Sequence, residues 1–206
     1  MFTLRTILLA AALTSPHLHA LPASDPSPVE GGYGMVRGPG YAFLLKAPAG
    51  WVIDASSGAE QGLPAVFYPK GSSWSESPVV GYARARPKTR SVSTVEETVK
   101  AVVGALRSGG NPRCVAKPLQ TIRTGNGQEG VIYRFDGLKS GDVEATAYFP
   151  EKRTLDFITL SCRSEKAFDA SLGAFRQLVA SYEFQTDKIP ADPNTQGYFR
   201  DGSPKD

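Results

Sequence analysis

The chain has 206 residues, a formal net charge of +3 and a hydrophobic content of 41%. That length and composition are typical of a globular protein built around one core. The mild positive charge does not indicate a nucleic-acid binder, whose basic face usually raises the pI of the domain above about 9. After the first twenty residues no segment approaches the roughly 20 apolar residues of a membrane-spanning helix, so we expect the mature protein to be soluble.

Residues 1–20 have the pattern of a secretory signal peptide. Arg5 lies near the start, an apolar run extends from Ile7 to Leu13, and small or neutral residues lead to Ala20. We expect the mature protein to begin at Leu21 and to reside in the periplasm or be secreted. No cysteine follows the cleavage site, so we expect no lipoprotein anchor.

The signal segment contains both histidines of the chain, His17 and His19. A mature chain without imidazole excludes Ser-His-Asp and Cys-His catalysis and every His-ligated zinc site. With Arg5 also removed, 22 basic residues (23 less one) face 20 acidic ones, a net charge of about +2.

Cys114 and Cys162 are the only two cysteines. Passage through an oxidising compartment favours a disulfide bond between them. In the chain-entropy model a loop of about 50 residues would stabilise the fold by roughly 4 kcal/mol. A redox-active pair would more often have Cys-x-x-Cys spacing.

The composition divides the mature chain into three parts. Residues 21–40 are rich in Pro, Gly and Ser, which indicates a linker. Residues 186–206 have the same character and are expected to form a flexible tail. The domain should therefore lie between residues 41 and 185.

The first half of that domain predicts four short strands. Each is bounded by Pro or Gly, and the last alternates cleanly between small and large side chains. The residues Pro48, Gly50 and Trp51 between the first two strands are expected to fix a turn and begin the core. The predicted strands are Tyr41–Lys46, Trp51–Ile53, Ala65–Tyr68 and Val79–Arg86.

A helix follows from about Ser93 to Gly109. Ser93 or Thr94 can cap its N-terminus, and Gly109 can end it. Its apolar stripe consists of Val95, Val99, Val102, Val103 and Leu106.

Four more strands and a second helix complete the domain. The helix is predicted from apolar residues at helical spacing in AFDASLGAFRQLVASYEF, residues 167–184. Gly-Asn-Gly, Lys-Ser-Gly-Asp and Glu-Lys-Arg between the strands suit hairpin turns. The four strands are Val115–Arg123, Gly130–Phe135, Val143–Phe149 and Leu155–Cys162.

This order predicts an α+β fold, an α/β/α sandwich with a mostly antiparallel sheet of about six or seven strands and two main helices. The strand Leu155–Cys162 is apolar on both faces. It should therefore be central and covered on both sides.

The sequence resembles the PsbP/DcrB-like superfamily. The resemblance covers about residues 40–185 and lies in the early strand with Tyr41 and Phe43, the Pro-x-Gly-Trp turn ending at Trp51, the order of the later elements, and the closing Ser-Tyr-Glu-Phe. That superfamily includes lumenal photosystem II subunits, small bacterial envelope proteins, cytoplasmic chaperones of secreted toxins and a Ran-binding nuclear import factor. The resemblance implies a protein-binding role, in the envelope branch given the secretion signal, and transfers no functional residue.

Two other patterns were weighed as sites. Gly125, Gly127 and Gly130 match G-x-G-x-x-G, but a strand-like segment follows where a dinucleotide site needs a helix. Asp142 and Glu144, with Asp136 nearby, could form a carboxylate pair or a weak calcium site, or simply a solvated turn. We therefore predict no enzyme and no cofactor, and keep an envelope enzyme or weak metal site at these carboxylates as the alternative.

The predicted binding residues are Trp74, Tyr82, Arg84 and Arg86. Alanines on the other side of their strand would allow a helix to pack closely, which leaves the arginines facing outward. Tyr, Trp and Arg are enriched at binding hot spots. We predict an exported, non-enzymatic protein-binding module with an acidic partner. The alternatives are a binder of anionic glycan or lipid, or a Trp74 that folds onto the sheet beside ordinary solvated arginines.

Overall fold

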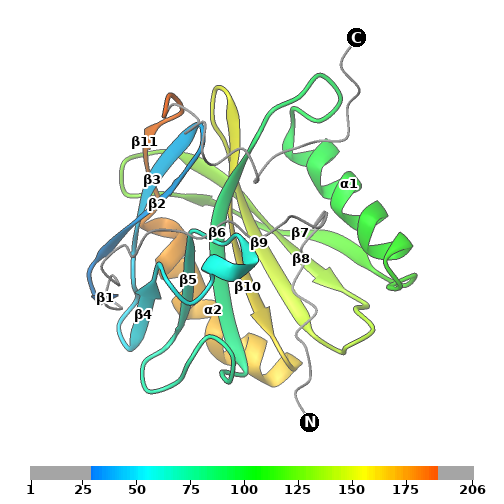
Figure 1. The fold of residues 1–206 in the computed structure, drawn as a ribbon. Coiled ribbons are helices and arrows are strands. Elements are labelled where there is room, and N and C mark those ends of the chain that lie inside the picture. The colour runs from blue at the N-terminus through cyan, green and yellow to red at the C-terminus, as the bar shows by residue number, and fades with distance from the viewer. Residues whose placement is uncertain (1–28, 190–206) are drawn as a thin grey trace.

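Residues 29–189 are described in the computed structural model of the chain, and the predicted signal peptide lies outside the described residues. This part of the chain contains strands, two α-helices and one short 3-10 helix (Figure 1). In chain order the elements are β1 (Val29–Glu30), β2 (Tyr33–Gly38), β3 (Tyr41–Lys46), β4 (Trp51–Asp54), η1 (Ala59–Gln61), β5 (Ala65–Pro69), β6 (Val79–Pro87), α1 (Val95–Ser108), β7 (Val115–Arg123), β8 (Glu129–Asp136), β9 (Val143–Pro150), β10 (Thr154–Cys162), α2 (Glu165–Ala180) and β11 (Glu183–Thr186).

The larger sheet has the strand order β1-β4-β5-β6-β10-β9-β8-β7. Every neighbouring pair in it is antiparallel. Strand β10 lies inside the sheet between β6 and β9, and eight of its nine residues are buried. The prediction of a mostly antiparallel sheet with this strand at its centre is confirmed.

The two helices pack on opposite faces of the larger sheet (Figure 1). Helix α1 begins at Thr94, whose side chain accepts a hydrogen bond from the backbone N–H of Glu97, while Glu97 accepts one from Thr94 in return. This capping box satisfies N–H groups that the first helical turn leaves without partners. The predicted sandwich and the predicted cap are therefore both present. Among residues 29–189, no helix has the length and apolar character needed to cross a membrane.

A smaller sheet, β11-β3-β2, packs on the α2 side and corrects two predicted boundaries. Strand β2 lies inside the segment predicted as linker. Its glycines are there for close packing, because a Cβ on Gly34 would lie 2.7 Å from the Ile53 side chain. The second helix ends at Ala180, and Glu183–Thr186 pair with β3 in place of the predicted helical end.

The predicted disulfide bond between Cys114 and Cys162 is wrong for this structure. Both thiols are buried, and the structure does not join them. Cys114 packs under α1 with Phe135, whereas Cys162 packs on the α2 face with Phe168. The sheet separates the two side chains, and a disulfide requires Cβ atoms about 4 Å apart.

Candidate binding site

Four side chains form a continuous row across β8, β9, β10 and β6, on the face that carries α1. The register places Phe157 opposite both Tyr148 and Arg84. The ring centroids of Tyr133 and Tyr148 are 6.1 Å apart, and those of Tyr148 and Phe157 are 6.2 Å apart. The guanidinium carbon of Arg84 lies 5.2 Å from the centre of the Phe157 ring. We call Tyr133, Tyr148, Phe157 and Arg84 the aromatic row.

The structure places the four predicted binding residues on this same face but exposes only two of them. Trp74 is 6% exposed and Tyr82 is 2% exposed, and both pack in a cluster with Tyr68. The expectation that Trp74 stands outside the core is therefore wrong, because its loop folds back over β5 and β6. Arg84 and Arg86 are half-buried.

The alanines of β6 behave as predicted. Ala83 and Ala85 are buried in the cluster that contains Phe168 and Phe175 of α2. Because successive side chains of a strand alternate between its faces, Arg84 and Arg86 lie on the opposite side. The close approach of α2 thus fixes which way the two arginines point.

The guanidinium groups of Arg84 and Arg86 are partly shielded from solvent. Burial lowers the pKa of Arg86, and the positive charge of Arg84 acts in the same direction. The Arg86 guanidinium nevertheless stays charged at neutral pH, because an arginine side chain is effectively always protonated in proteins. A guanidinium group that lies over an aromatic ring can still donate hydrogen bonds from its edge to a carboxylate. This arrangement is therefore suitable for an acidic ligand.

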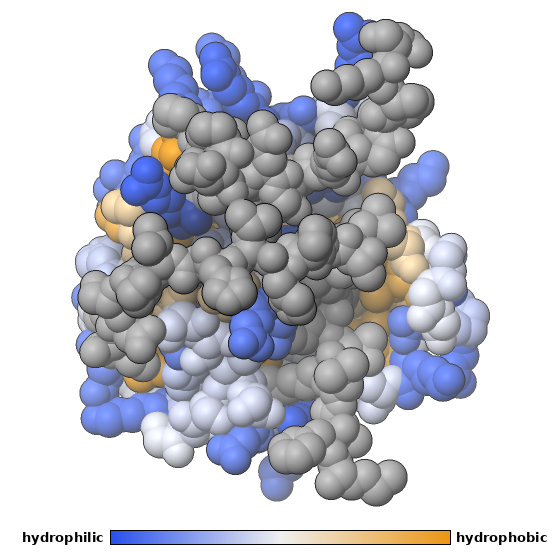
Figure 2. Space-filling model, in the orientation of Figure 1, coloured by the Kyte–Doolittle hydropathy of each residue, from blue (hydrophilic) through white to orange (hydrophobic). Residues whose placement is uncertain are grey.

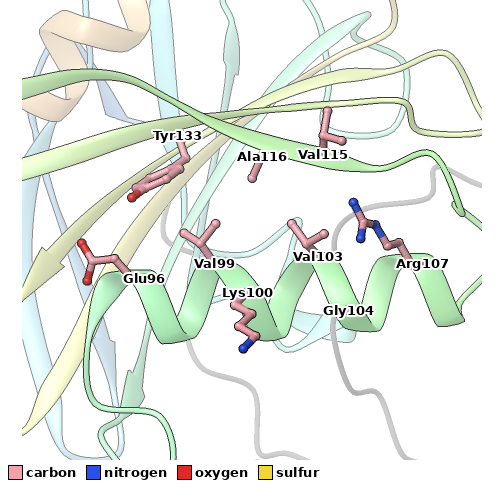
Figure 3. A pocket seen from close by; sticks show the side chains of 9 residues that line it. All are labelled: Glu96, Val99, Lys100, Val103, Gly104, Arg107, Val115, Ala116 and Tyr133. Carbon is pink, nitrogen blue, oxygen red and sulfur yellow. The ribbon is translucent and has the colours of Figure 1, made fainter.

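A pocket of about 540 Å³ lies between α1 and the strands β7 and β8 (Figure 3). Val99 and Val103 from the helix and Val115, Ala116 and Tyr133 from the strands provide its apolar lining. Tyr133 is also the end of the aromatic row, so the pocket and the row are continuous. Figure 2 shows hydrophobic surface on the side of the molecule where α1 lies, bordered by hydrophilic residues.

Charged side chains stand along the helical edge of the pocket. Glu96 lies at the end near Tyr133, and Lys100 and Arg107 lie farther along α1 (Figure 3). The Nε of Arg107 donates to the carbonyl oxygen of Cys114 at 2.9 Å, which fixes the direction of the guanidinium group. The pocket therefore has an apolar lining with Arg107 at one end and Glu96 at the other, whereas the Lys100 ammonium points away from the strands (Figure 3).

The predicted carboxylate site is not assembled. Asp136 pairs with Arg134 at 2.8 Å, whereas Glu144 is fully buried in β9. Asp142 is held by the hydroxyl of Ser140 in the preceding turn. Within residues 29–189 no group of three or more His, Cys, Asp and Glu side chains is placed to hold a metal ion.

A different polar cluster was missed by the sequence reasoning. The hydroxyl of Tyr182 lies 2.9 Å from Glu151 Oε1 and 2.9 Å from Asp156 Oδ2. Thr154 donates to Asp156, and the side-chain amide of Gln128 donates to Glu151. The available signal was the single acidic residue in the otherwise apolar strand TLDFITL, because a buried acid requires partners.

Comparison with known proteins gives weak similarities only. No family model matches the sequence, and no curated protein matches it significantly. Among solved structures, cyanobacterial PsbP (CyanoP) from Synechocystis is 16% identical over 79% of this chain and 98% of its own, with a TM-score of 0.45. A protein from Bacteroides thetaiotaomicron is 10% identical over 77% of this chain and 50% of its own, with a TM-score of 0.39. Similarity at this level says nothing about activity or partners, and the resemblance to the PsbP/DcrB-like superfamily stays a prediction.

Proposed function

We propose that this protein is an exported, non-enzymatic protein-binding module that holds an acidic segment of a partner on Arg84, Arg86 and the aromatic row. The observation that carries the proposal is the pair of half-buried arginines on one strand face, one of them above the Phe157 ring. Among residues 29–189 neither arginine forms a salt bridge. A partly desolvated guanidinium gains most from a carboxylate supplied by a partner.

The surrounding side chains favour a protein partner. Arg, Tyr and Phe bury large areas at protein interfaces, where they are enriched in the fully buried centre. Trp74 and Tyr82 lie in the cluster beside the arginines and take part by supporting β6 from this face. An anionic glycan or lipid surface would use the same charges, and the test below separates these ligands.

Exchanging the two charges tests the proposal. We expect the double substitution Arg84→Glu with Arg86→Glu to abolish capture of a protein from envelope extract. With a purified partner, it should lower the binding affinity by at least about tenfold. The neutral pair Arg84→Gln with Arg86→Gln should weaken binding less and reduce its salt dependence. Capture is measured by mass spectrometry of the bound proteins, and affinity by titration at two salt concentrations.

The matched control places the same charge change on the other side of the molecule. Lys166→Glu with Arg176→Glu alters two exposed residues of α2 and should leave binding unchanged. Thermal unfolding of each variant separates lost binding from lost folding. Unchanged affinity in the folded arginine variant would contradict the proposal, and so would retention of glycan or lipid without any protein.

Export is part of the proposed function and depends on residues 1–20. We expect the intact mass of the protein from an envelope fraction or the medium to correspond to a chain that begins at Leu21. Mass spectrometry of the purified native protein measures this directly. A chain that retains Met1 in the cytoplasmic fraction would contradict export while leaving the binding surface to be judged by the arginine variants.

A further inference from the structure

The pocket between α1 and β7 contains a glycine where a helix gains nothing from one. Gly104 lies in the interior of α1 and lines the pocket. Among residues 29–189 a Cβ at this position would meet nothing within 4 Å, so the packing of these residues does not require a glycine here. Glycine inside a helix costs about 1 kcal/mol relative to alanine. Its one visible effect is to keep the side of the pocket open.

The apolar surface of the pocket continues beyond it along β7. Val115 and Leu119 are each 36% exposed, and among the described residues only two other large hydrophobic side chains are more exposed. Strand β7 is the last strand of the larger sheet, so nothing in that sheet covers its outer edge. Pro118 and a register shift between Pro118 and Gln120 interrupt the edge, which disfavours addition of another strand. The surface is therefore better suited to inserted side chains than to strand pairing.

The exposure of the lining selects the kind of ligand. Lys100, Gly104, Arg107 and Val115 are all exposed. A pocket that binds a small molecule usually buries about 70–90% of the surface of that ligand. This pocket is too open to bury so large a fraction of a small amphiphile. An apolar side chain carried by a partner protein has its remaining surface covered by the partner itself. The pocket thus fits a protein better than a free fatty acid.

The charges select the sequence around that side chain. Arg107 stands at one end of the pocket and Glu96 at the other, and the Lys100 ammonium points away from the pocket (Figure 3). We propose that the pocket holds one large apolar side chain of the protein partner proposed above, with a partner carboxylate beside it on Arg107. This inference rests on the proposed function and adds a second contact to it.

The distance between the two contacts defines the spacing in the partner. Tyr133 and Arg84 lie on strands separated by β9 and β10, so these two strands are about 14 Å apart at about 4.8 Å per strand. An extended chain covers that distance in about four or five residues. The partner segment should therefore carry its apolar anchor and, about five residues away, the acidic residue that contacts Arg84 and Arg86.

The test uses three probes on the isotope-labelled protein. These are the peptides Ser-Asp-Trp-Asp-Ser and Ser-Lys-Trp-Lys-Ser, both with blocked termini, and laurate. We expect the acidic peptide to shift the methyl NMR signals of Val99, Val103 and Val115 and to bind at least about fivefold more tightly than the basic peptide. Equal affinity for the two peptides, unmoved methyl signals, or tighter binding of laurate than of either peptide would overturn the inference.

Two variants fill or spoil the pocket, and one serves as the control. Gly104→Trp should occupy the pocket and remove peptide binding, whereas Gly104→Ala should retain binding and raise the unfolding temperature. If the Gly104→Trp protein does not fold, Val115→Glu replaces it in the test, because this substitution changes an exposed residue. It should lower the affinity for the acidic peptide in the same way. Full peptide binding by a folded pocket variant would overturn the inference. If substitution of Arg84 and Arg86 abolishes capture of the partner while the pocket variants retain it, the inference about the pocket is overturned and the proposed function is not.

Discussion

Replacing Glu144 with Gln is expected to make the protein roughly 3 kcal/mol more stable than the wild type at about pH 8, and about equally stable at about pH 5. Glu144 is 0% exposed, and among residues 29–189 its carboxyl oxygens form no hydrogen bond of normal geometry. Burial raises its pKa from 4.5 to about 8, with a smaller contribution from Asp142 and an opposing one from Ser161. The folded protein therefore holds Glu144 as the neutral acid.

The sign follows from proton binding. Between pH 4.5 and about 8 the folded state keeps a proton on Glu144 that the unfolded state releases. The contribution of Glu144 to the free energy of unfolding is therefore fully present below its unfolded pKa. It falls by up to about 1.4 kcal/mol for each pH unit as the pH rises through this range. A glutamine cannot lose that proton, so its advantage over glutamate grows with pH.

Urea unfolding of the wild type and of Glu144→Gln at several pH values between about 5 and 8 measures the difference. The control is Glu60→Gln, the same substitution at an exposed residue of η1, and it should not reproduce the effect. A constant difference between the Glu144→Gln protein and the wild type would contradict a neutral buried Glu144.

Replacing Tyr182 with Phe is expected to lower the stability at neutral pH by about 2–3 kcal/mol. The Tyr182 hydroxyl contacts Glu151 and Asp156 at 2.9 Å each, yet it has one hydrogen to donate. The raised pKa of Asp156 lets its carboxyl group keep a proton close to neutral pH and donate it to the phenol oxygen, so the two acids share one proton. The variant loses both contacts, and among residues 29–189 it leaves the buried Asp156 with Thr154 as its remaining side-chain partner.

The packing of the ring should survive this change. The Tyr182 ring stacks on Phe149 with centroids 3.9 Å apart and an interplanar angle of 6°, which phenylalanine can reproduce. Chemical denaturation with near-UV circular dichroism therefore separates the lost hydroxyl from lost packing. Tyr133→Phe is the control, because the Tyr133 side chain lies at the edge of the pocket and is half-buried. A Tyr182→Phe protein as stable as the wild type would contradict the shared proton.

The same cluster predicts a pH dependence of its own. Burial raises the pKa of Asp156 from 3.8 to about 7, and hydrogen bonds from Thr154 and Tyr182 oppose the shift. Burial also raises the pKa of Glu151, whereas the positive charge of Lys88 lowers it. The stabilisation is complete below the unfolded pKa of Asp156 and is lost as the pH rises to about 7. The Tyr182→Phe difference should therefore be measured on both sides of this range.

The candidate site was only partly predictable from the sequence. The period-2 pattern of VVGYARAR correctly separated Ala83 and Ala85, which contact the α2 cluster, from Arg84 and Arg86. The aromatic row draws one residue from each of four strands, so it depends on the pairing register and has no signal in any single segment. Trp74 shows the same limit, because a loop without periodicity does not reveal that its side chain folds back onto the sheet.

The sequence by itself determined the elements whose stability is local. Strand alternation, the capping box at Thr94 and the glycine after α1 depend on contacts within a few residues, and these placed the main strands and both helices. The tertiary structure alone decided that Gly34 lies in a strand, that Cys114 and Cys162 lie on opposite faces, and that Glu144 is fully buried. Each of these outcomes depends on contacts between residues distant in the chain. The free energy of such contacts depends on which elements pack against each other in the folded chain. A pattern within a short segment does not specify that packing.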